Sequence, residues 1–396
     1  MTLSFKKIVG KLHLVLGLSS GLVVFIVSIT GCIYAFQKEI QDLTQDYRYV
    51  EAQDAAYLPP SILVERAEEA LEGRSASRVY YETQERAAYV LFLKDGEYYT
   101  TYLNPYTGEV LKVKNMRQDF FTIILYLHMT LLLPYGEHIV GISTIIFFIM
   151  LVSGIILWWP KNKAGRKQRF TVKWNARWRR KNYDLHNVLG FYMTWVSLFV
   201  TITGLVFAYG WMKESVYWLA GGGDYEEVYP VSDPEARTAV ANPVDKAWRT
   251  VHGSLPQGYG SMVLLPTTDT APIYVLTSRT DGTFSELQYH YFDQYTAERI
   301  DDKAYFRTKP FTKASVAEKI IRMNYDIHTG GIFGFAGKLL AFFASLVAAS
   351  LPVTGFMIWR GRRKKKGEKR ATPQKTGKKK AAAKLSMKRP KMKENV

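Results

Sequence analysis

Four long stretches of the chain contain almost no charged residues, and they dominate its pattern of hydrophobic and polar positions. Each stretch has 21 to 25 residues, and about 20 apolar residues in a helix suffice to cross the hydrocarbon of a bilayer. The stretches are Leu12 to Phe36, Ile139 to Trp159, Val188 to Trp211 and Leu339 to Trp359. The pattern predicts a membrane protein with a bundle of four transmembrane helices.

The two long segments between these stretches have a different pattern, which is repeated. The first begins with the helical pattern "PSILVERAEEALEG" and continues through the alternating runs of "SRVYYETQERAAYVLFLKDGEYYTTYLNPYTGEVLKV". The second has the helical "PVDKAWRTVHGS" and then "GSMVLLP", "APIYVLTSR" and "SELQYHYFDQYTAERI". Runs that alternate and are rich in aromatic residues indicate strands. The similarity of "YLNPYTGEVL" to "YFDQYTAERI" indicates one α+β module used twice.

The expected fold is therefore an all-α four-helix transmembrane bundle with two α+β domains on one side of the membrane. The expected segments are 1–37 (helix 1), 38–119 (first domain), 120–160 (an interfacial helix and helix 2), 161–184 (basic loop), 185–213 (helix 3), 214–325 (second domain), 326–360 (helix 4) and 361–396 (disordered basic tail).

The distribution of charge orients the chain in the membrane. The net charge is +18, and 30 of the 53 Lys and Arg residues lie before the first stretch, between residues 161 and 181, and from residue 360 onward. These segments face one side, which the positive-inside rule makes the cytoplasm. Both termini are then cytoplasmic. The excess of basic residues is explained by contact with anionic lipids, without a nucleic acid partner.

Each apolar stretch carries a hydroxyl residue followed by glycine, and histidines stand at matching distances from these pairs. The pairs are Thr30-Gly31, Ser153-Gly154, Thr203-Gly204 and Thr354-Gly355. His13 and His186 each precede a pair by 17 residues, whereas His128 and His328 precede theirs by 25 and 26. Small residues allow membrane helices to approach closely, so we interpret the pairs as sites of helix packing.

The four histidines predict a cofactor. His13 and His186 lie at the cytoplasmic ends of their helices and His128 and His328 at the outer ends, about 25 Å away along a helix. Zinc requires three or four protein ligands, and neither pair has a Cys, Asp or Glu at ligand spacing. Haem requires only two axial nitrogens and an apolar space between helices. We expect two haems, one at each pair; another metal, or a purely structural polar helix end, remains an alternative.

Several other residues belong to this hypothesis. His138 is the alternative outer ligand, and His138 and Lys338 are possible contacts for haem propionates. Asp184, Asn187, Asp326 and Thr329 neighbour the histidines in sequence and are candidates to orient them, although helix capping is the expected role of the two aspartates. We expect His252 and His290, in the outer domains, to have no role in binding a cofactor.

The ordered motifs resemble a known family. They are "LHLVLGL...TG", "LYLHMTLLL...SGIILWWP", "DLHNVLGFY...TGLVF" and "DIHTGGIFG...TGFMIWR", with the "NPYTGEVL" turn between the first two. Together they resemble the PepSY-associated transmembrane helix family, which includes bacterial inner-membrane ferric-siderophore reductases. The resemblance covers residues 1 to about 363. It implies two PepSY-like periplasmic domains and two haem b groups, with His13, His128, His186 and His328 as axial ligands.

The resemblance also implies a function, namely the transfer of electrons outward to reduce Fe(III) bound in a periplasmic siderophore. The expected electron donor is a quinol, a reduced flavin or a separate reductase, since the chain contains no Gly-rich nucleotide loop. Two alternatives remain open at this point. One is a non-enzymatic membrane protein whose domains bind or regulate a periplasmic partner, and the other is a haem reductase that acts on a thiol, copper or a cytochrome.

Overall fold

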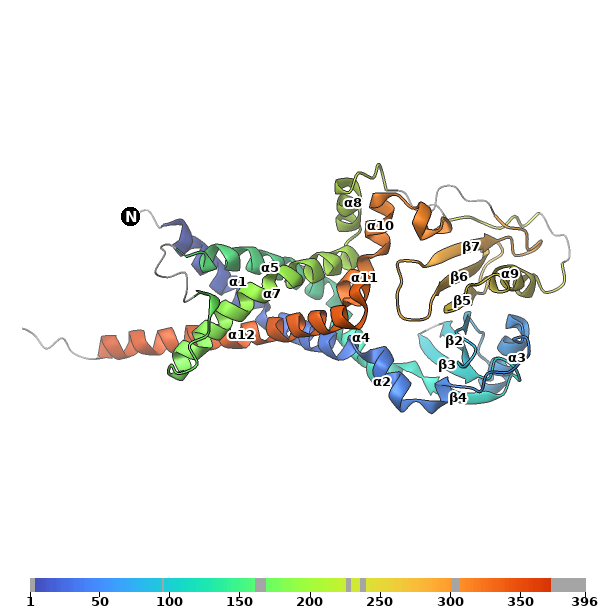
Figure 1. Cartoon of the computed structure of the whole chain (residues 1–396), viewed down its shortest axis with the longest axis horizontal. Coiled ribbons are helices and arrows are strands. Elements are labelled where there is room, and N and C mark those ends of the chain that lie inside the picture. The colour runs from blue at the N-terminus through green and yellow to red at the C-terminus, as the bar shows by residue number, and fades with distance from the viewer. Residues whose placement is uncertain are drawn as a thin grey trace, which may run out of the picture.

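The computed structural model describes residues 4–94, 96–160, 169–225, 229–235, 240–300 and 306–371. A bundle of long helices forms one end of the molecule, and a β-sheet with two covering helices forms the other (Figure 1). The N-terminus and the end of the last helix lie at the far end of the bundle. We call this the tail-side end, and the opposite end of the bundle the sheet-side end.

The bundle contains four helices that are long and apolar enough to cross a membrane, as the sequence predicts. They are α1 (Phe5–Tyr34), α5 (Gly136–Trp158), α7 (Trp178–Ala208) and α12 (Gly334–Ala371). α1 packs against α5 and α12, and α7 packs against the same two helices. The four helices therefore form a ring in which α1 is diagonal to α7.

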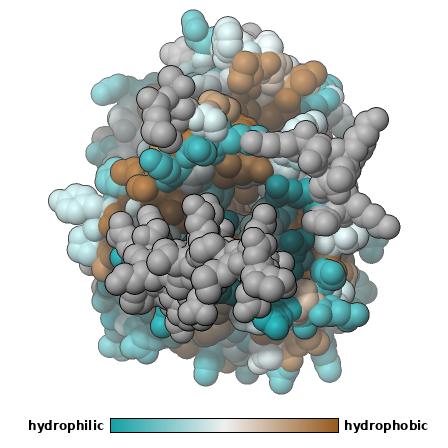
Figure 2. Space-filling model, turned by 90° about the vertical axis from the view of Figure 1, so that its left-hand side faces the viewer, coloured by the Kyte–Doolittle hydropathy of each residue, from teal (hydrophilic) through white to brown (hydrophobic). Residues whose placement is uncertain are grey.

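Two of these helices extend beyond the apolar stretches that predict them. α7 begins ten residues before Val188, within the basic segment "WRRKNYDLHN". α12 continues to Ala371, although we expected a disordered tail from residue 361. Arg, Lys and Ala all favour helices, so a helix continues readily into a basic segment. The tail-side surface accordingly carries many hydrophilic residues (Figure 2). The predicted loop residues 161–168 and tail residues 372–396 lie outside the described residues.

Two short helices lie at the sheet-side end and lead into the second and fourth long helices. α4 (Phe120–Thr130) begins at Asp119, whose side chain accepts a hydrogen bond from the backbone of Thr122. α11 (Asn324–Thr329) ends at Gly330, which has a φ of 79°. It is preceded by α10 (Val316–Arg322), which has a Ser315–Glu318 capping box. α4 is a short apolar helix at the place where the sequence predicts a helix before the second long helix.

The two long segments between the apolar stretches both contribute to a single seven-stranded antiparallel sheet, where we expected two separate domains. The strands are β1 (Arg78–Tyr81), β2 (Ala88–Lys94), β3 (Glu97–Leu103), β4 (Val110–Asn115), β5 (Tyr259–Leu264), β6 (Ile273–Arg279) and β7 (Gln288–Phe292). Their order is β4-β3-β2-β1-β5-β6-β7, with Val79 opposite Val263 where the two segments join. An unpaired strand edge can pair with another chain and cause aggregation. The pairing of β1 with β5 covers one edge of each half of the sheet.

The segment between α1 and α5 and the segment between α7 and α12 share a turn of the same geometry, at the place where their sequences are similar. In the first segment, the backbone N–H of Asn104 donates to the carbonyl of Glu109 over 2.9 Å. The second segment has the same bond at the same length, from Asp293 to Glu298. Gly108 and Ala297 occupy matching positions with φ values of 75° and 53°. Glycine adopts a positive φ more easily than alanine does. The turn nevertheless has the same geometry in both segments, although the second has Ala297 where the first has Gly108.

Helices α3 (Pro60–Ala70) and α9 (Pro243–His252), one from each segment, pack against the sheet and against each other. The Ser61 hydroxyl of α3 donates to the Asp245 carboxylate of α9 over 2.6 Å. One core is shared by both segments and includes Leu63, Ala67, Val79, Val90, Leu103, Ala247, Trp248, Val263, Ile273 and Phe292. The helices and strands that the sequence predicts therefore meet in one folding unit, the sheet domain.

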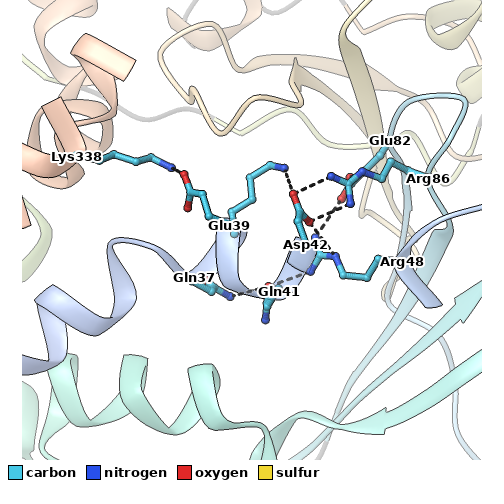
Figure 3. A network of polar contacts seen from close by, with 9 residues as sticks. Gln37, Glu39, Gln41, Asp42, Arg48, Glu82, Arg86 and Lys338 are labelled. Atoms are coloured by element: carbon cyan, nitrogen blue, oxygen red, sulfur yellow. Dashed lines mark hydrogen bonds and ion pairs between the residues drawn. The ribbon is translucent and has the colours of Figure 1, made fainter. Parts of the chain in front are cut away.

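A network of ion pairs joins the sheet domain to the bundle through α2 (Gln37–Thr44), which follows α1 (Figure 3). Asp42 accepts two hydrogen bonds from Arg86 of the sheet domain, at 2.9 and 2.7 Å. Burial raises the pKa of Asp42, but hydrogen bonds from Arg86 and Lys38 outweigh it and lower the pKa to about 2. On the other side of α2, Glu39 accepts from Lys338 of α12 over 2.7 Å. The position of the sheet domain is thus fixed by charges on both sides of one short helix.

Substitution of Leu63 tests whether the two segments form one unit. Leu63 is fully buried in α3, and Leu63→Ala is expected to cost about 2–5 kcal/mol because it leaves a cavity. Hydrogen exchange should then accelerate in β5 and β6 as much as in β1 and β2. The exposed Glu65→Ala in the same helix serves as the control. Acceleration confined to the first segment would show that the halves unfold separately.

A second prediction concerns pH. Burial lowers the pKa of His252 to about 4, and burial together with the charge of Arg299 lowers that of His290 to about 4. The unfolded chain binds these protons near pH 6.5, so the free energy of unfolding should fall as pH falls from about 6.5 to about 4. Hydrogen exchange in β5 and β6, corrected for its intrinsic pH dependence, measures this. His252→Gln should reduce the slope, whereas an unchanged slope in a His252→Gln, His290→Gln variant would contradict the assignment.

Candidate functional site

The four histidines that the sequence singles out lie in two pairs, one at each end of the bundle. At the sheet-side end, His128 of α4 faces His328 of α11, with ring centres 6.2 Å apart and ring planes at 72°. At the tail-side end lie His13 of α1, which contacts Ser153 of α5, and His186 of α7, which contacts Thr354 of α12. We call the two groups the sheet-side pair and the tail-side pair.

Each of the four imidazoles is held through its Nδ1 by a hydroxyl on a neighbouring element. The hydroxyl always belongs to one of the four hydroxyl–glycine pairs. The distances are 2.8 Å from His13 to Ser153, 3.2 Å from His128 to Thr30, 2.8 Å from His186 to Thr354 and 3.0 Å from His328 to Thr203. In each half of the chain, therefore, the first histidine is held by the second long helix and the second histidine by the first.

The hydrogen bonds of these hydroxyl groups determine which ring nitrogen carries the proton. Each hydroxyl lies within donating distance of a carbonyl one turn earlier in its own helix: Ser153 of Met150 at 3.1 Å, Thr354 of Ser350 at 2.9 Å, Thr30 of Ile26 and Thr203 of Phe199 both at 2.8 Å. A hydroxyl has one hydrogen, so a hydroxyl that donates it to this carbonyl accepts from the imidazole. In that arrangement Nδ1 carries the proton, and Nε2 keeps its lone pair.

Backbone carbonyls support the same assignment at the sheet-side pair. His128 Nδ1 lies 2.9 Å from the carbonyl oxygen of Val27, and His328 Nδ1 lies 3.0 Å from that of Val200. A carbonyl can only accept a hydrogen bond, so both rings must donate from Nδ1. This is the tautomer in which a second hydrogen bond orients a histidine that binds a metal through its other nitrogen.

The glycine of each pair provides space for the ring. A Cβ atom added at Gly31 would lie 3.2 Å from Cε1 of His128, and one at Gly355 would lie 3.3 Å from Cε1 of His186. Gly204 stands in the same relation to His328, at 3.3 Å, and Gly154 to His13, at 3.7 Å. We interpreted these pairs as sites of helix packing, but in the structure each pair holds an imidazole. The regular spacing along the chain indicated that the histidines and the hydroxyl–glycine pairs belong together. It did not show which histidine contacts which pair, because the contacts are made between different elements.

The other candidate residues lie elsewhere. His138 is exposed, with Glu137 at 3.8 Å, so His128 and not His138 faces His328. Lys338 is bonded to Glu39, and its predicted contact with a haem propionate stays a prediction. The four sequence neighbours make their bonds away from the rings. Asp184 accepts from Lys173 and Arg180, Asn187 bonds Tyr183 and Arg169, Asp326 accepts from Phe284 and Ser285, and Thr329 donates to Tyr325.

The geometry of the histidines fits a haem iron better than a metal with more protein ligands. Among the described residues, no group of three or more His, Cys, Asp or Glu side chains could hold a metal ion. An imidazole nitrogen lies about 2.0–2.1 Å from a metal that it binds, and the centre of the ring lies ~1.1 Å further away. Two imidazoles that bind one iron from opposite sides therefore have ring centres about 6 Å apart. The 6.2 Å of His128 and His328 meets this requirement.

Replacement of a hydroxyl tests the tautomer assignment. Thr354→Val keeps the side-chain volume but removes the hydroxyl acceptor of His186 Nδ1. We expect the nitrogen NMR shifts of His186 in the cofactor-free protein to change from the Nδ1–H form to a mixture of tautomers. Thr194→Val is the control, because Thr194 is buried in α7 and its hydroxyl donates to the carbonyl of Gly190 in its own helix. A wild-type His186 protonated on Nε2 would contradict the assignment.

Comparison with known proteins places this site within a family. The model of the PepSY-associated TM region matches residues 11–362, which include both histidine pairs and all four hydroxyl–glycine pairs. No curated protein matches the chain. Four apolar helices of spanning length agree with this match. The chain therefore belongs to the family of the PepSY-associated TM region and is a membrane protein.

Proposed function

We propose that the chain is an inner-membrane oxidoreductase that contains two haem b groups and passes electrons outward to reduce a periplasmic ferric siderophore. The observation that carries this proposal is that four imidazoles lie in two pairs and contact a hydroxyl through Nδ1, while no hydrogen bond to their Nε2 is made by the described residues. Packing alone does not require all four rings to have the same tautomer. Binding of two metal centres through Nε2 would explain why they share one.

Some of these residues would hold the haems, and others would orient the imidazole rings. His13 and His186 would hold one haem, and His128 and His328 the other, while the four hydroxyl–glycine pairs fix the ring orientations. The haems would supply one-electron redox chemistry, whose potential depends on ligand identity, burial and hydrogen bonds to the ligands. Two histidines would hold each haem, and the chemistry that the haems would supply there is electron transfer and not reaction with oxygen.

The distance between the pairs supports transfer across a membrane. His13 lies near the start of α1, and Thr30, which holds His128, lies 17 residues later in the same helix. At 1.5 Å per residue this separation is about 25 Å, close to the hydrocarbon thickness of about 30 Å. The basic segments at the tail-side end favour the cytoplasm on that side. The sheet domain and the sheet-side pair would then be periplasmic.

The choice of substrate is supported by the resemblance of the motifs to ferric-siderophore reductases. A ferric chelate that accepts one electron becomes a ferrous chelate, and oxygen ligands of a siderophore hold Fe(II) far less tightly than Fe(III). Helices α4 and α11, which carry the sheet-side pair, lie at the end of the bundle that adjoins the sheet domain (Figure 1), so the proposed chelate would be reduced at that end. The electron donor would be a quinol, a reduced flavin or a separate reductase protein.

Replacement of the histidines by alanine tests the proposal. The purified wild type should contain two haems per chain, and each of the four single variants should lose the haem of its own pair. In membranes with a defined donor, all four variants should reduce a ferric siderophore at least ten times more slowly, since each interrupts one of two centres in series. Absorbance of the reduced protein measures haem, and Fe(II) capture by a chelator measures reduction.

The exposed histidine provides a matched control for these variants. His138→Ala should keep both haems and the wild-type rate, because His138 lies outside both pairs. A wild type purified without haem from haem-replete cells would reject the whole proposal. Two haems with no reduction of any ferric siderophore would reject only the substrate.

A further inference from the structure

One five-residue pattern occurs twice in the second half of the chain, immediately around the histidines. Residues 182–186 read "NYDLH" and residues 324–328 read "NYDIH". The first copy lies in α7 and ends at a tail-side histidine, whereas the second lies in α11 and ends at a sheet-side histidine. The same pattern therefore occurs once at each of the two sites.

The asparagine of each copy reaches the threonine that holds the histidine of that copy. Asn182 Nδ2 donates to the backbone carbonyl of Thr354 over 3.1 Å, and His186 is bonded to the hydroxyl of that same threonine. Asn324 Nδ2 donates to the backbone carbonyl of Thr203 over 3.2 Å, while the Thr203 hydroxyl holds His328. Each copy is thus joined to one threonine by two hydrogen bonds one helical turn apart.

The aspartate of each copy anchors the same segment on its other side. Asp184 accepts hydrogen bonds from the backbone of Lys173 and from Arg180. Asp326 accepts from the backbone N–H groups of Phe284 and Ser285, at 2.9 and 2.8 Å, which belong to the sheet domain. Both carboxylates are buried, with exposed fractions of 2% and 1%. The histidine of each copy therefore stands on a segment fixed from two directions.

The first half of the chain lacks this arrangement. The positions one turn before His13 and His128 are Val9 and Ile124, whose side chains cannot donate a hydrogen bond. Each pair consequently combines one histidine from the first half, which has no such asparagine, with one from the second half that has it. The two sites share this asymmetry although they lie at opposite ends of the bundle.

We propose that Asn182 and Asn324 are positioning residues that make His186 and His328 the fixed ligand of each haem, leaving His13 and His128 as the ligands that a competitor displaces. This inference rests on the proposed haem function. A buried amide lowers stability unless it is fully hydrogen-bonded, and Oδ1 of Asn182 has no partner among the described residues. An apolar residue would serve packing alone better, so the donated bond explains why asparagine stands here.

The experiment compares two asparagine variants with matched controls in the full-length, haem-loaded protein. Asn182→Ala and Asn324→Ala each remove one bond between elements. Asn187→Ala and Thr329→Ala remove side chains beside the same histidines; each of these side chains donates to a carbonyl of its own helix, and Asn187 also accepts from Arg169 over 3.4 Å. The first measurement is the rate at which haem is lost to a haem-free acceptor protein. The second is the fraction of reduced haem that binds carbon monoxide, which requires a displaced ligand.

The wild type should bind carbon monoxide at most slowly, through displacement of His13 or His128. In Asn182→Ala, haem affinity should fall ~10–100-fold and carbon monoxide should bind readily. Only the haem that His186→Ala also removes should change. Asn324→Ala should do the same only to the haem of His328, and the controls should resemble the wild type. Asn182→Leu, which preserves volume, gives the same test if the alanine variant is not recovered.

Unchanged rates of haem loss and carbon monoxide binding in both asparagine variants would overturn the inference, as would equal changes in Asn187→Ala. These results presuppose a wild type that contains haem. A wild type without haem would instead overturn the proposed function on which the inference rests, so the two failures are distinguished by the first absorbance spectrum.

Discussion

The hydrogen bond from an imidazole Nδ1 to a hydroxyl on a neighbouring element is the interaction on which the rest of the site depends. It fixes the tautomer and frees Nε2, and it joins two elements of the bundle at the depth where a cofactor would bind. The hydroxyl can accept because its own hydrogen is used within its helix, and the ring fits because glycine follows. Histidines, hydroxyl residues and glycines from six elements thereby fix the orientation of an imidazole at four positions.

The same duplication organises the bundle and the sheet domain. In the bundle, each half contributes one histidine to each end, so neither half forms a complete site. In the sheet domain, each half contributes a helix and strands, and the halves join where β1 pairs with β5. α2 connects the two parts through Asp42 and Glu39, whose partners belong to the sheet domain and to α12 respectively. A single chain with two similar halves therefore behaves structurally as a fused dimer.

Much of this fold could be predicted from the sequence because hydropathy and alternation are local signals. The four long helices, α3 and α9, the strands and the repeated turn at Asn104 and Asp293 were all accessible in this way. The pairing of His13 with Ser153, or of β1 with β5, was not, because it depends on contacts between distant segments. Asp326 illustrates the difference: its position before a histidine suggested a helix cap, but its carboxylate binds a loop of the sheet domain.

The central claim is that Nε2 of each of the four histidines binds haem iron while Nδ1–H is held by a hydroxyl. Electron paramagnetic resonance of the oxidised protein, combined with nitrogen hyperfine spectroscopy on histidine-labelled samples, tests this most directly. The account predicts two low-spin ferric signals, each with two histidine nitrogens on the iron and an exchangeable proton on the far nitrogen of each ring. A high-spin signal, or iron bound by a single histidine at either site, would contradict it.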